Sequence, residues 1–222
     1  MIVNIVQEMK TLKLADTSVF LHDNDLPESL INHNEISIDT ETTGLNLFRD
    51  RLCLIQISVS KKECHLVKFN KSNLNDLKCT NLIRTLENKK IKKIFHFARF
   101  DLAVIKKFLG VKCENIFCTK IASKLVRTYT DRHGLKDLCK EMLDIDLNKS
   151  QQSSDWSAKD LSDNQLKYAS YDVIFLHDLK KKLIQMLERE GRLNLSEKIF
   201  SFLETRVDLD LSGWNDIDIF AH

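Results

Sequence analysis

The chain has 222 residues, of which 43% are hydrophobic and 30% are charged, with one proline and five glycines. This composition suits one globular domain with a sizeable core and excludes a low-complexity, disordered or repeat protein. The formal net charge is only +2, so bulk charge does not indicate a nucleic-acid-binding protein. Local lysine runs are either phosphate-neutralising patches or a solvated surface. They lie at 61–62, 89–90, 92–93, 106–107 and 180–182.

The first half of the chain predicts most of a β-sheet. Short segments rich in apolar and β-branched residues read as strands, and turn signals such as Gly44 separate them. Residues 1–18 are ambiguous: residues 2–6 form a further strand, or the whole stretch is an N-terminal extension. The predicted strands are 19–22, 35–40, 52–59, 65–69 and 91–95.

Helical spacing of apolar residues dominates the second half. It predicts a helix over 102–109, which Gly110 ends, and a long helix from Ser162 to about residue 190, which opens with the capping-box pair Ser162 and Gln165. Strands come first and helices later, which predicts an α/β fold: a mixed sheet flanked by helices, with a helix-rich C-terminal half. The other predicted helices are 74–86 and 193–203.

Six cysteines are spread along the chain without a CxxC pair. No secretory signal and no apolar stretch long enough to span a membrane is evident, so we read the cysteines as reduced thiols of a cytoplasmic protein. Cys113 and Cys118 lack a partner pair at zinc spacing, which disfavours a zinc site. The sequence predicts no membrane association and no obligate protein partner.

Asp39 and Glu41, at the end of the predicted strand 35–40, are the most informative pair of residues. Side chains two apart on a strand point to the same face. An aspartate and a glutamate aimed at one point are unfavourable unless a cation lies there. The pair therefore suggests half of a metal site.

Two further acidic motifs follow. Asp101 lies in the first turn of a helix that follows a strand, where a carboxylate also favours the positive end of the helix dipole. Tyr168 and Asp172 are four residues apart on a predicted helix and share a face, as they also would on an ordinary amphipathic helix. Together with Asp39 and Glu41 these motifs supply four carboxylates.

Four carboxylates can hold two hard divalent cations such as Mg²⁺, which prefer oxygen ligands. Two ions about 4 Å apart stabilise the attacking and the leaving oxygen in phosphodiester cleavage. The Tyr168 hydroxyl, on the same helix face as Asp172, is placed to orient or help deprotonate the attacking water.

In these motifs the chain resembles the ribonuclease D family, within the larger group of 3′-5′ exonucleases that use four acidic residues. The matching phrases are Asp-x-Glu at 39–41, His-Phe-Ala-Arg-Phe-Asp at 96–101 and Tyr-x-x-x-Asp at 168–172. Lys167 stands where a related subclass has histidine, which favours the tyrosine subclass. The stretch from Ser154 to Ala169 also resembles the family.

The resemblance implies a ribonuclease H-like fold, two Mg²⁺ or Mn²⁺ ions, and release of 5′-mononucleotides from single-stranded 3′ ends of RNA, including transfer RNA. By this analogy Asp39, Glu41 and Asp172 hold the first ion, Asp39 bridges to the second, and Asp101 reaches the second. Tyr168 completes the catalytic set.

The resemblance also suggests nucleic-acid contacts, each with an alternative in the core or in a turn. Leu45 is placed like the family's apolar wedge against the terminal base, or is a plain turn leucine. His96 and Phe100 line the substrate groove or pack in the core, and Trp156 stacks on a base or is buried. Thr40 is grouped with these contacts.

We expect a single exonuclease domain over residues 19–205, an N-terminal extension over 1–18 and a C-terminal tail over 206–222. Too few residues follow Leu183 for the helical nucleic-acid-binding domains of longer family members, so the chain resembles the short, single-domain form. Two alternatives remain: a 3′-5′ DNA exonuclease, because 2′-hydroxyl contacts cannot be located from the sequence, and a catalytically silent nucleic-acid-binding scaffold.

Overall fold

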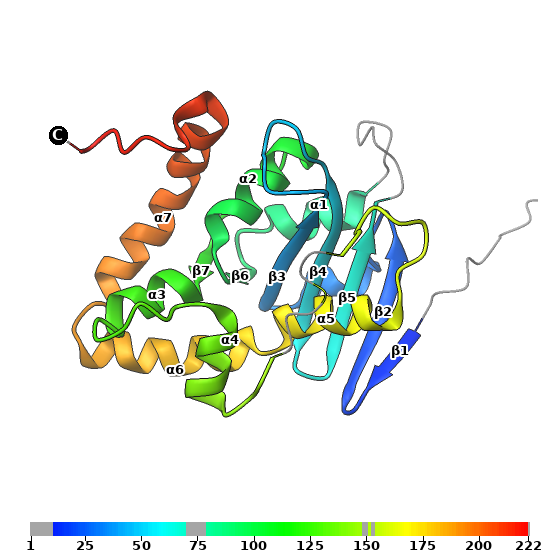
Figure 1. The fold of residues 1–222 in the computed structure, drawn as a ribbon, viewed down its shortest axis with the longest axis horizontal. Helices are drawn as coiled ribbons and strands as arrows, with labels where there is room; N and C mark the ends of the chain where they lie inside the picture. Colours follow the sequence, from blue (N-terminus) through cyan, green and yellow to red (C-terminus); the bar gives the residue numbers. More distant parts are fainter. Residues whose placement is uncertain (1–10, 70–78, 148–150, 152–153, 222) are drawn as a thin grey trace, which may run out of the picture.

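The computed structural model describes residues 11–69, 79–147, 151 and 154–221. In this part of the chain, seven strands form one mixed sheet in the order β1-β2-β5-β4-β3-β6-β7 (Figure 1). The strands are β1 Thr11–Leu14, β2 Thr17–Asp23, β3 Glu35–Thr42, β4 Leu52–Ser60, β5 Glu63–Lys68, β6 Lys92–Phe95 and β7 Ile116–Cys118.

The strand directions bring several chain segments to one edge of the sheet. β3 pairs antiparallel with β4 and parallel with β6, and β6 pairs parallel with β7. The carboxyl ends of β3, β6 and β7 therefore point the same way. Helices begin directly after β6 and β7, so the end of β3 lies beside two helix N-termini.

Helices cover the sheet and extend beyond its β7 edge (Figure 1). α5 packs on β3, β4 and β5, whereas α2 contacts β3, β4 and β6. Between sheet and helices lies a core that includes the fully buried Ile38, Leu54 and Ile57. The α-helices are α1 Thr80–Glu87, α2 Ala98–Leu109, α3 Thr119–Val126, α4 Leu135–Leu138, α5 Asp163–Ile174, α6 Leu176–Arg189 and α7 Leu193–Leu209.

The five strands at 19–22, 35–40, 52–59, 65–69 and 91–95 are confirmed, with ends shifted by a few residues. β1 and β7 are not predicted by the sequence pattern because they have only 4 and 3 residues, too few to show a period. β7 also separates α2 from α3, so a second helix lies between strands. The predicted strand 2–6 and residues 74–78 of the predicted helix lie outside the described residues.

The long helix predicted from Ser162 to about residue 190 is two helices, α5 and α6, which meet at Phe175. Its predicted start is confirmed: the Gln165 backbone N–H donates to Ser162 Oγ at 3.3 Å, and the Ser162 N–H donates to Gln165 Oε1 at 3.0 Å. The break lets α5 follow the sheet while α6 turns away to contact α3 and β6.

The last helix is longer than predicted, and part of the expected tail is packed structure. α7 continues to Leu209 and passes into a π-helical turn at Asp210–Trp214. Asp210 is only 2% exposed; Arg99 Nε on α2 donates to it at 2.6 Å, and Arg206 lies 3.0 Å away. The end of α7 therefore anchors α2. Within the described ranges, no helix is both long and apolar enough to cross a membrane.

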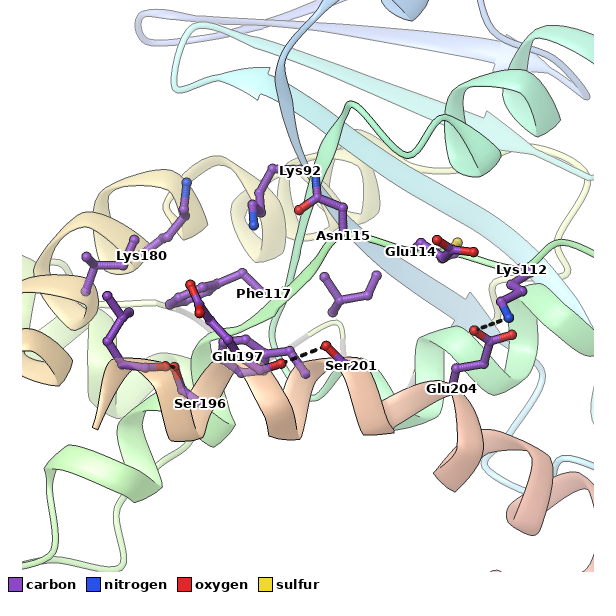
Figure 2. A pocket seen from close by; sticks show the side chains of 15 residues that line it. Lys92, Lys112, Glu114, Asn115, Phe117, Lys180, Ser196, Glu197, Ser201 and Glu204 are labelled. Carbon is purple, nitrogen blue, oxygen red and sulfur yellow. Dashed lines mark hydrogen bonds and ion pairs between the residues drawn. The ribbon is translucent and has the colours of Figure 1, made fainter. Parts of the chain in front are cut away.

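A cavity of about 660 Å³ lies where α7 passes the edge strand β7 (Figure 2). Its charged lining residues are mixed in sign. Lys112 Nζ lies 2.8 Å from Glu204 Oε2 on α7, and Figure 2 shows this pair at one end of the cavity. The other charged residues of the lining are Lys92, Glu114, Lys180 and Glu197.

Candidate active site

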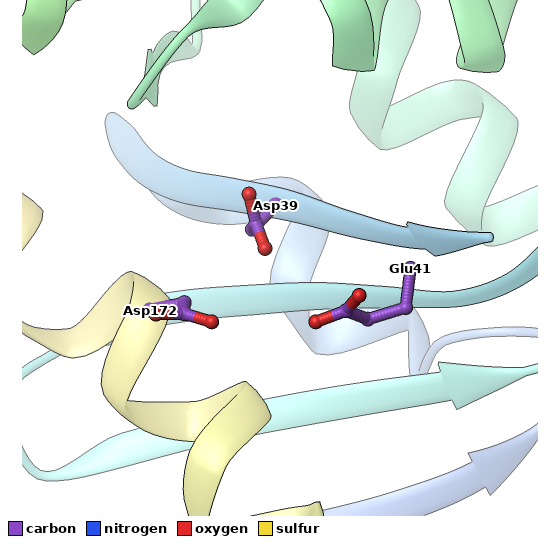
Figure 3. Close-up of side chains that lie close together, drawn as sticks. All are labelled: Asp39, Glu41 and Asp172. Atoms are coloured by element: carbon purple, nitrogen blue, oxygen red, sulfur yellow. The ribbon is translucent and has the colours of Figure 1, made fainter. Parts of the chain in front are cut away.

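Three carboxylates meet where β3 passes under α5 (Figure 3). Asp39 and Glu41 project from one face of β3, as the two-residue spacing predicts, and Asp172 comes from α5. Each offers an oxygen atom, and these three atoms lie within 4.8 Å of one another. The fold thus brings three of the predicted metal ligands together.

The position of Asp172 follows from how α5 packs on the sheet. Ala169 and Ser170 are fully buried, and their small side chains allow close approach of the helix. Ser37 Oγ on β3 donates a hydrogen bond to the Val173 carbonyl oxygen at 2.8 Å. Because Val173 follows Asp172 directly, this bond fixes the helix turn that carries the carboxylate.

Asp101, the fourth predicted acid, lines the same pocket but lies outside the group of three. It is 4% exposed, and the Thr40 hydroxyl donates to its Oδ1 at 2.7 Å. Thr40 is itself only 7% exposed. Its hydroxyl orients Asp101, and because Thr40 also lines the pocket, its contact with nucleic acid stays a prediction.

The pocket around these acids has a volume of about 320 Å³. Leu45, His96, Phe100 and Tyr168 line it together with the four acids, so these sequence predictions converge on one place. Thr40 and Phe97, which lie within the motifs, also line it, and the other lining residues come from segments that the motifs do not mark. They are Lys120, Gly134, Leu135, Lys136 and Leu147.

The acids repel one another because several carboxylates lie close together in one buried pocket. Burial raises the pKa of Asp39 to about 7. Burial, with the charges of Asp39, Asp172 and Asp101, raises the pKa of Glu41 to about 10. Burial and the charge of Asp39 also raise the pKa of Asp101 well above its ordinary value. Such an arrangement favours a bound cation, which would restore the charged forms.

Tyr168 stands beside the acids as a neutral phenol. Burial and the negative charge of Asp172 raise the pKa of its hydroxyl above the ordinary value. The group is thus a hydrogen-bond donor and acceptor at neutral pH rather than a tyrosinate.

Trp156 does not reach the pocket, contrary to the stacking role considered for it. It is 3% exposed, and its ring packs against the ring of Tyr168, with centroids 6.0 Å apart and planes inclined by 40°. Trp156 is therefore a buried core tryptophan, which was the other interpretation of this residue. Trp156 thus packs against Tyr168 from the side of the core.

Leu45 projects from the loop that joins β3 to β4 and is 82% exposed. The loop is closed by hydrogen bonds from the Thr43 N–H to the Arg51 carbonyl oxygen at 3.0 Å and from the Asn46 N–H to Asp50 Oδ2 at 2.9 Å. Gly44 is needed here, since an added Cβ would lie 2.4 Å from Asp50 Oδ2. An ordered loop therefore holds an apolar side chain at the mouth of the pocket.

Gln56 is a neighbour of the site that sequence reasoning misses. Strand register places it opposite Asp39, and its Nε2 donates to Asp39 Oδ2 at 3.5 Å. Gln56 is fully buried, and its Oε1 has no hydrogen-bond partner. Only the pairing of β3 with β4, which a single sequence does not reveal, could have identified it.

These donors fit Mg²⁺ or Mn²⁺. All are carboxylate oxygens, which hard divalent cations prefer, and their mutual repulsion is relieved by positive charge. Asp39, Glu41 and Asp172 lie close enough to share one ion, and Asp101 is available for a second.

A mixed sheet with helices on its faces and an acidic pocket at the end of its third strand defines a nuclease domain with the ribonuclease H-like fold. The chain belongs to the 3′-5′ exonuclease family, whose model matches residues 21–188. The resemblance to ribonuclease D is confirmed as well: Ribonuclease D of Gluconacetobacter diazotrophicus is 32% identical over 159 residues, 72% of this chain and 39% of that protein.

Similarity extends over nearly the whole chain in one solved structure. Brucella melitensis NrnC is 51% identical, with a TM-score of 0.87, and the match covers 92% of this chain and 98% of that chain. DNA polymerase I of Aquifex aeolicus is 35% identical over 158 residues, 71% of this chain and 25% of that protein. This chain spans only about two fifths of the length of Ribonuclease D of Gluconacetobacter diazotrophicus.

Proposed function

We propose that this 3′-5′ exonuclease is a divalent-metal-dependent exoribonuclease that releases 5′-mononucleotides from single-stranded 3′ ends. One observation carries the proposal: carboxylate oxygens of Asp39, Glu41 and Asp172 lie within 4.8 Å of one another, next to Tyr168 in the same pocket. Hydrolysis of a phosphodiester needs such a concentration of oxygen ligands for metal ions.

The four acids divide the metal binding. Asp39, Glu41 and Asp172 would hold one ion, and Asp39 and Asp101 would hold a second. Bound ions supply the positive charge that stabilises the attacking and the leaving oxygen. A structure of Brucella melitensis NrnC contains bound Mg²⁺, which supports this metal for the present chain.

Tyr168 orients the attacking water through its neutral hydroxyl. Its helix turn is shared with Asp172, so the hydroxyl and one metal ligand move as a unit. The packing of Trp156 on the Tyr168 ring restricts the ring further, which keeps the hydroxyl aimed into the pocket.

The bound chain end is unpaired and short. A cavity of about 320 Å³ has no room for a duplex, and exposed Leu45 at its mouth is placed to wedge against a terminal base. NrnC of Brucella melitensis has been solved with pGG bound, which supports RNA as the substrate here. Trimming of transfer-RNA 3′ ends is the cellular role that the ribonuclease D likeness suggests.

DNA is the second candidate substrate. The similarity to DNA polymerase I of Aquifex aeolicus favours DNA. The same four acids could act on DNA, which lacks the 2′-hydroxyl of RNA. The four acids and the tyrosine are all present, which argues against a silent scaffold.

A time course on matched 5′-labelled RNA and DNA oligonucleotides, with 3′-hydroxyl or 3′-phosphate ends, tests the proposal. We expect RNA with a 3′-hydroxyl to shorten one nucleotide at a time from its 3′ end, with 5′-mononucleotides as products and no cleavage in the presence of chelator. Internal cuts, or equal activity after chelation, would contradict the proposal. Faster shortening of DNA would select the second candidate.

A further inference from the structure

Phe97 has a backbone conformation that is unusual for its residue type. It precedes α2 with φ 79° and ψ 44°, in the left-handed region. Bulky residues other than glycine rarely adopt positive φ, and such strain concentrates at functional sites. Phe97 lies between His96 and Ala98 in the motif that leads to Asp101, so the strain falls within the pocket wall.

The strained backbone directs an aromatic ring into an exposed position. Phe97 is 46% exposed, although most large apolar residues of this fold are buried. It lines the acidic pocket together with Leu45 and Phe100. An aromatic ring kept partly in water next to a nuclease site offers a surface on which a nucleobase can stack.

A lysine ammonium group lies over the Phe97 ring. Lys120, in the first turn of α3, places its Nζ 4.2 Å from the centroid of the Phe97 ring and lines the same pocket. A polyanionic strand approaching four carboxylates is repelled unless positive charge lies near its phosphates. Lys120 brings such a positive charge to the pocket wall, beside the Phe97 ring.

We propose that Phe97 and Lys120 form a nucleotide-binding subsite, in which the ring stacks on a nucleobase of the single strand and the ammonium group binds the adjacent phosphate. This subsite deepens the proposed function and rests on it. Glycine and asparagine adopt positive φ more readily than phenylalanine, but neither would offer a ring for stacking.

The variant Phe97→Asn removes the ring and keeps the backbone, because asparagine adopts positive φ more readily than phenylalanine. We expect its melting temperature to be equal to or above that of the wild type. The assay compares RNA oligonucleotides in which an abasic nucleotide replaces one of the last three positions in turn.

In the wild type, loss of the base at one position should lower kcat/KM on the order of tenfold, in line with the usual strength of base stacking. In Phe97→Asn the same abasic substitution should have no effect, because the stacking partner is already gone. Equal losses in both proteins at every position, or no loss in the wild type at any position, would overturn the subsite.

Lys120→Met tests the phosphate contact, with Lys124→Met as the matched control, since Lys124 is exposed on the same helix and outside the pocket. Log kcat/KM of the wild type falls with log salt, and one lost phosphate contact makes that slope shallower by about 0.7 for a single strand. We expect this change for Lys120→Met only. An unchanged slope, or the same change in Lys124→Met, would overturn the phosphate contact.

Failure of the subsite is distinguishable from failure of the proposed function. If the wild type shortens unmodified RNA while Phe97→Asn responds to abasic substitution as the wild type does, only the subsite is wrong. If the wild type shortens no RNA at all, the proposed function fails, and the subsite fails with it.

Discussion

The acidic pocket and the cavity beside α7 differ in how their charges are balanced. The cavity, at about 660 Å³, is roughly twice as large as the pocket, at about 320 Å³. Four of its six charged lining residues form ion pairs: Lys112 with Glu204, Glu114 with Lys89, and Lys180 with Glu35 on β3. In the pocket, by contrast, several carboxylates face one another.

The comparison teaches that mutual repulsion among carboxylates, rather than cavity volume, distinguishes the acidic pocket. Side chains that already form ion pairs gain little electrostatic free energy from a bound ion. Carboxylates whose pKa values are raised by burial and by one another gain most from a cation, and perturbed groups of this kind cluster at functional sites. The predictions below test this contrast.

The largest effect is expected for Asp39→Asn. It removes the predicted bridging ligand, so kcat/KM should fall about 1,000-fold or more, because metal ions contribute several kcal/mol to such reactions. Without metal, the variant should be at least as stable as the wild type, since one repulsive charge is gone. The measurements are RNA cleavage and thermal unfolding.

Glu204→Gln is the matched control in the cavity beside α7. It breaks the ion pair with Lys112 and should cost no more than about 1 kcal/mol of stability, with activity unchanged. If Glu204→Gln lost activity as Asp39→Asn does, the contrast between the two regions would not hold.

Tyr168→Phe should lower kcat about 100-fold, the usual scale for loss of a group that positions or transfers a proton. The phenyl ring still packs on Trp156, so the melting temperature should stay close to that of the wild type. Full activity in Tyr168→Phe would show that the hydroxyl has no catalytic role.

The repulsion among the acids should appear as a pH dependence of stability. The folded protein keeps a proton on Glu41 up to a pKa of about 10, compared with an ordinary value of 4.5. The unfolded chain has lost that proton by neutral pH, so the free energy of unfolding falls as pH rises. Between about pH 7 and 8.5, above the titration of unfolded histidines, Glu41 should contribute up to about 1.4 kcal/mol per pH unit to this fall.

Chemical denaturation of the metal-free protein across this range measures the slope. Glu41→Gln should flatten it, because the titrating group is gone, and Mg²⁺ should stabilise the wild type more at the higher pH. Parallel profiles for the wild type and Glu41→Gln would show that Glu41 is not protonated in the folded state.

The smallest effect is expected for Gln56→Met. The substitution removes the donor to Asp39 and also an unsatisfied buried acceptor, so stability should change by less than about 1 kcal/mol. Activity should fall severalfold, with a weaker affinity for Mg²⁺, because Asp39 is less well oriented. Unchanged metal affinity would limit Gln56 to a packing role.

The sequence allowed the acids and Tyr168 to be predicted because their spacing matches strand and helix periods. Asp39 and Glu41 share a strand face, and Tyr168 and Asp172 share a helix face, whatever the rest of the fold does. The five main strands and the start of α5 were predictable for the same local reason.

The residues that were missed depend on distant parts of the chain. Gln56 is recognised only through the pairing of β4 with β3, and Lys120 only because the fold brings the start of α3 to the pocket. Phe97 carries no composition signal for its positive φ. The burial of Trp156 likewise follows from tertiary packing, which no local pattern reports.

Titration of the metal-free protein with Mn²⁺, followed by calorimetry, tests most directly whether the carboxylates of the acidic pocket form the metal site. The wild type and Glu204→Gln should bind Mn²⁺ with equal affinity, and Asp39→Asn should bind it at least tenfold more weakly. Equal Mn²⁺ affinity in the wild type and Asp39→Asn would contradict the assignment of the acidic pocket as the metal site.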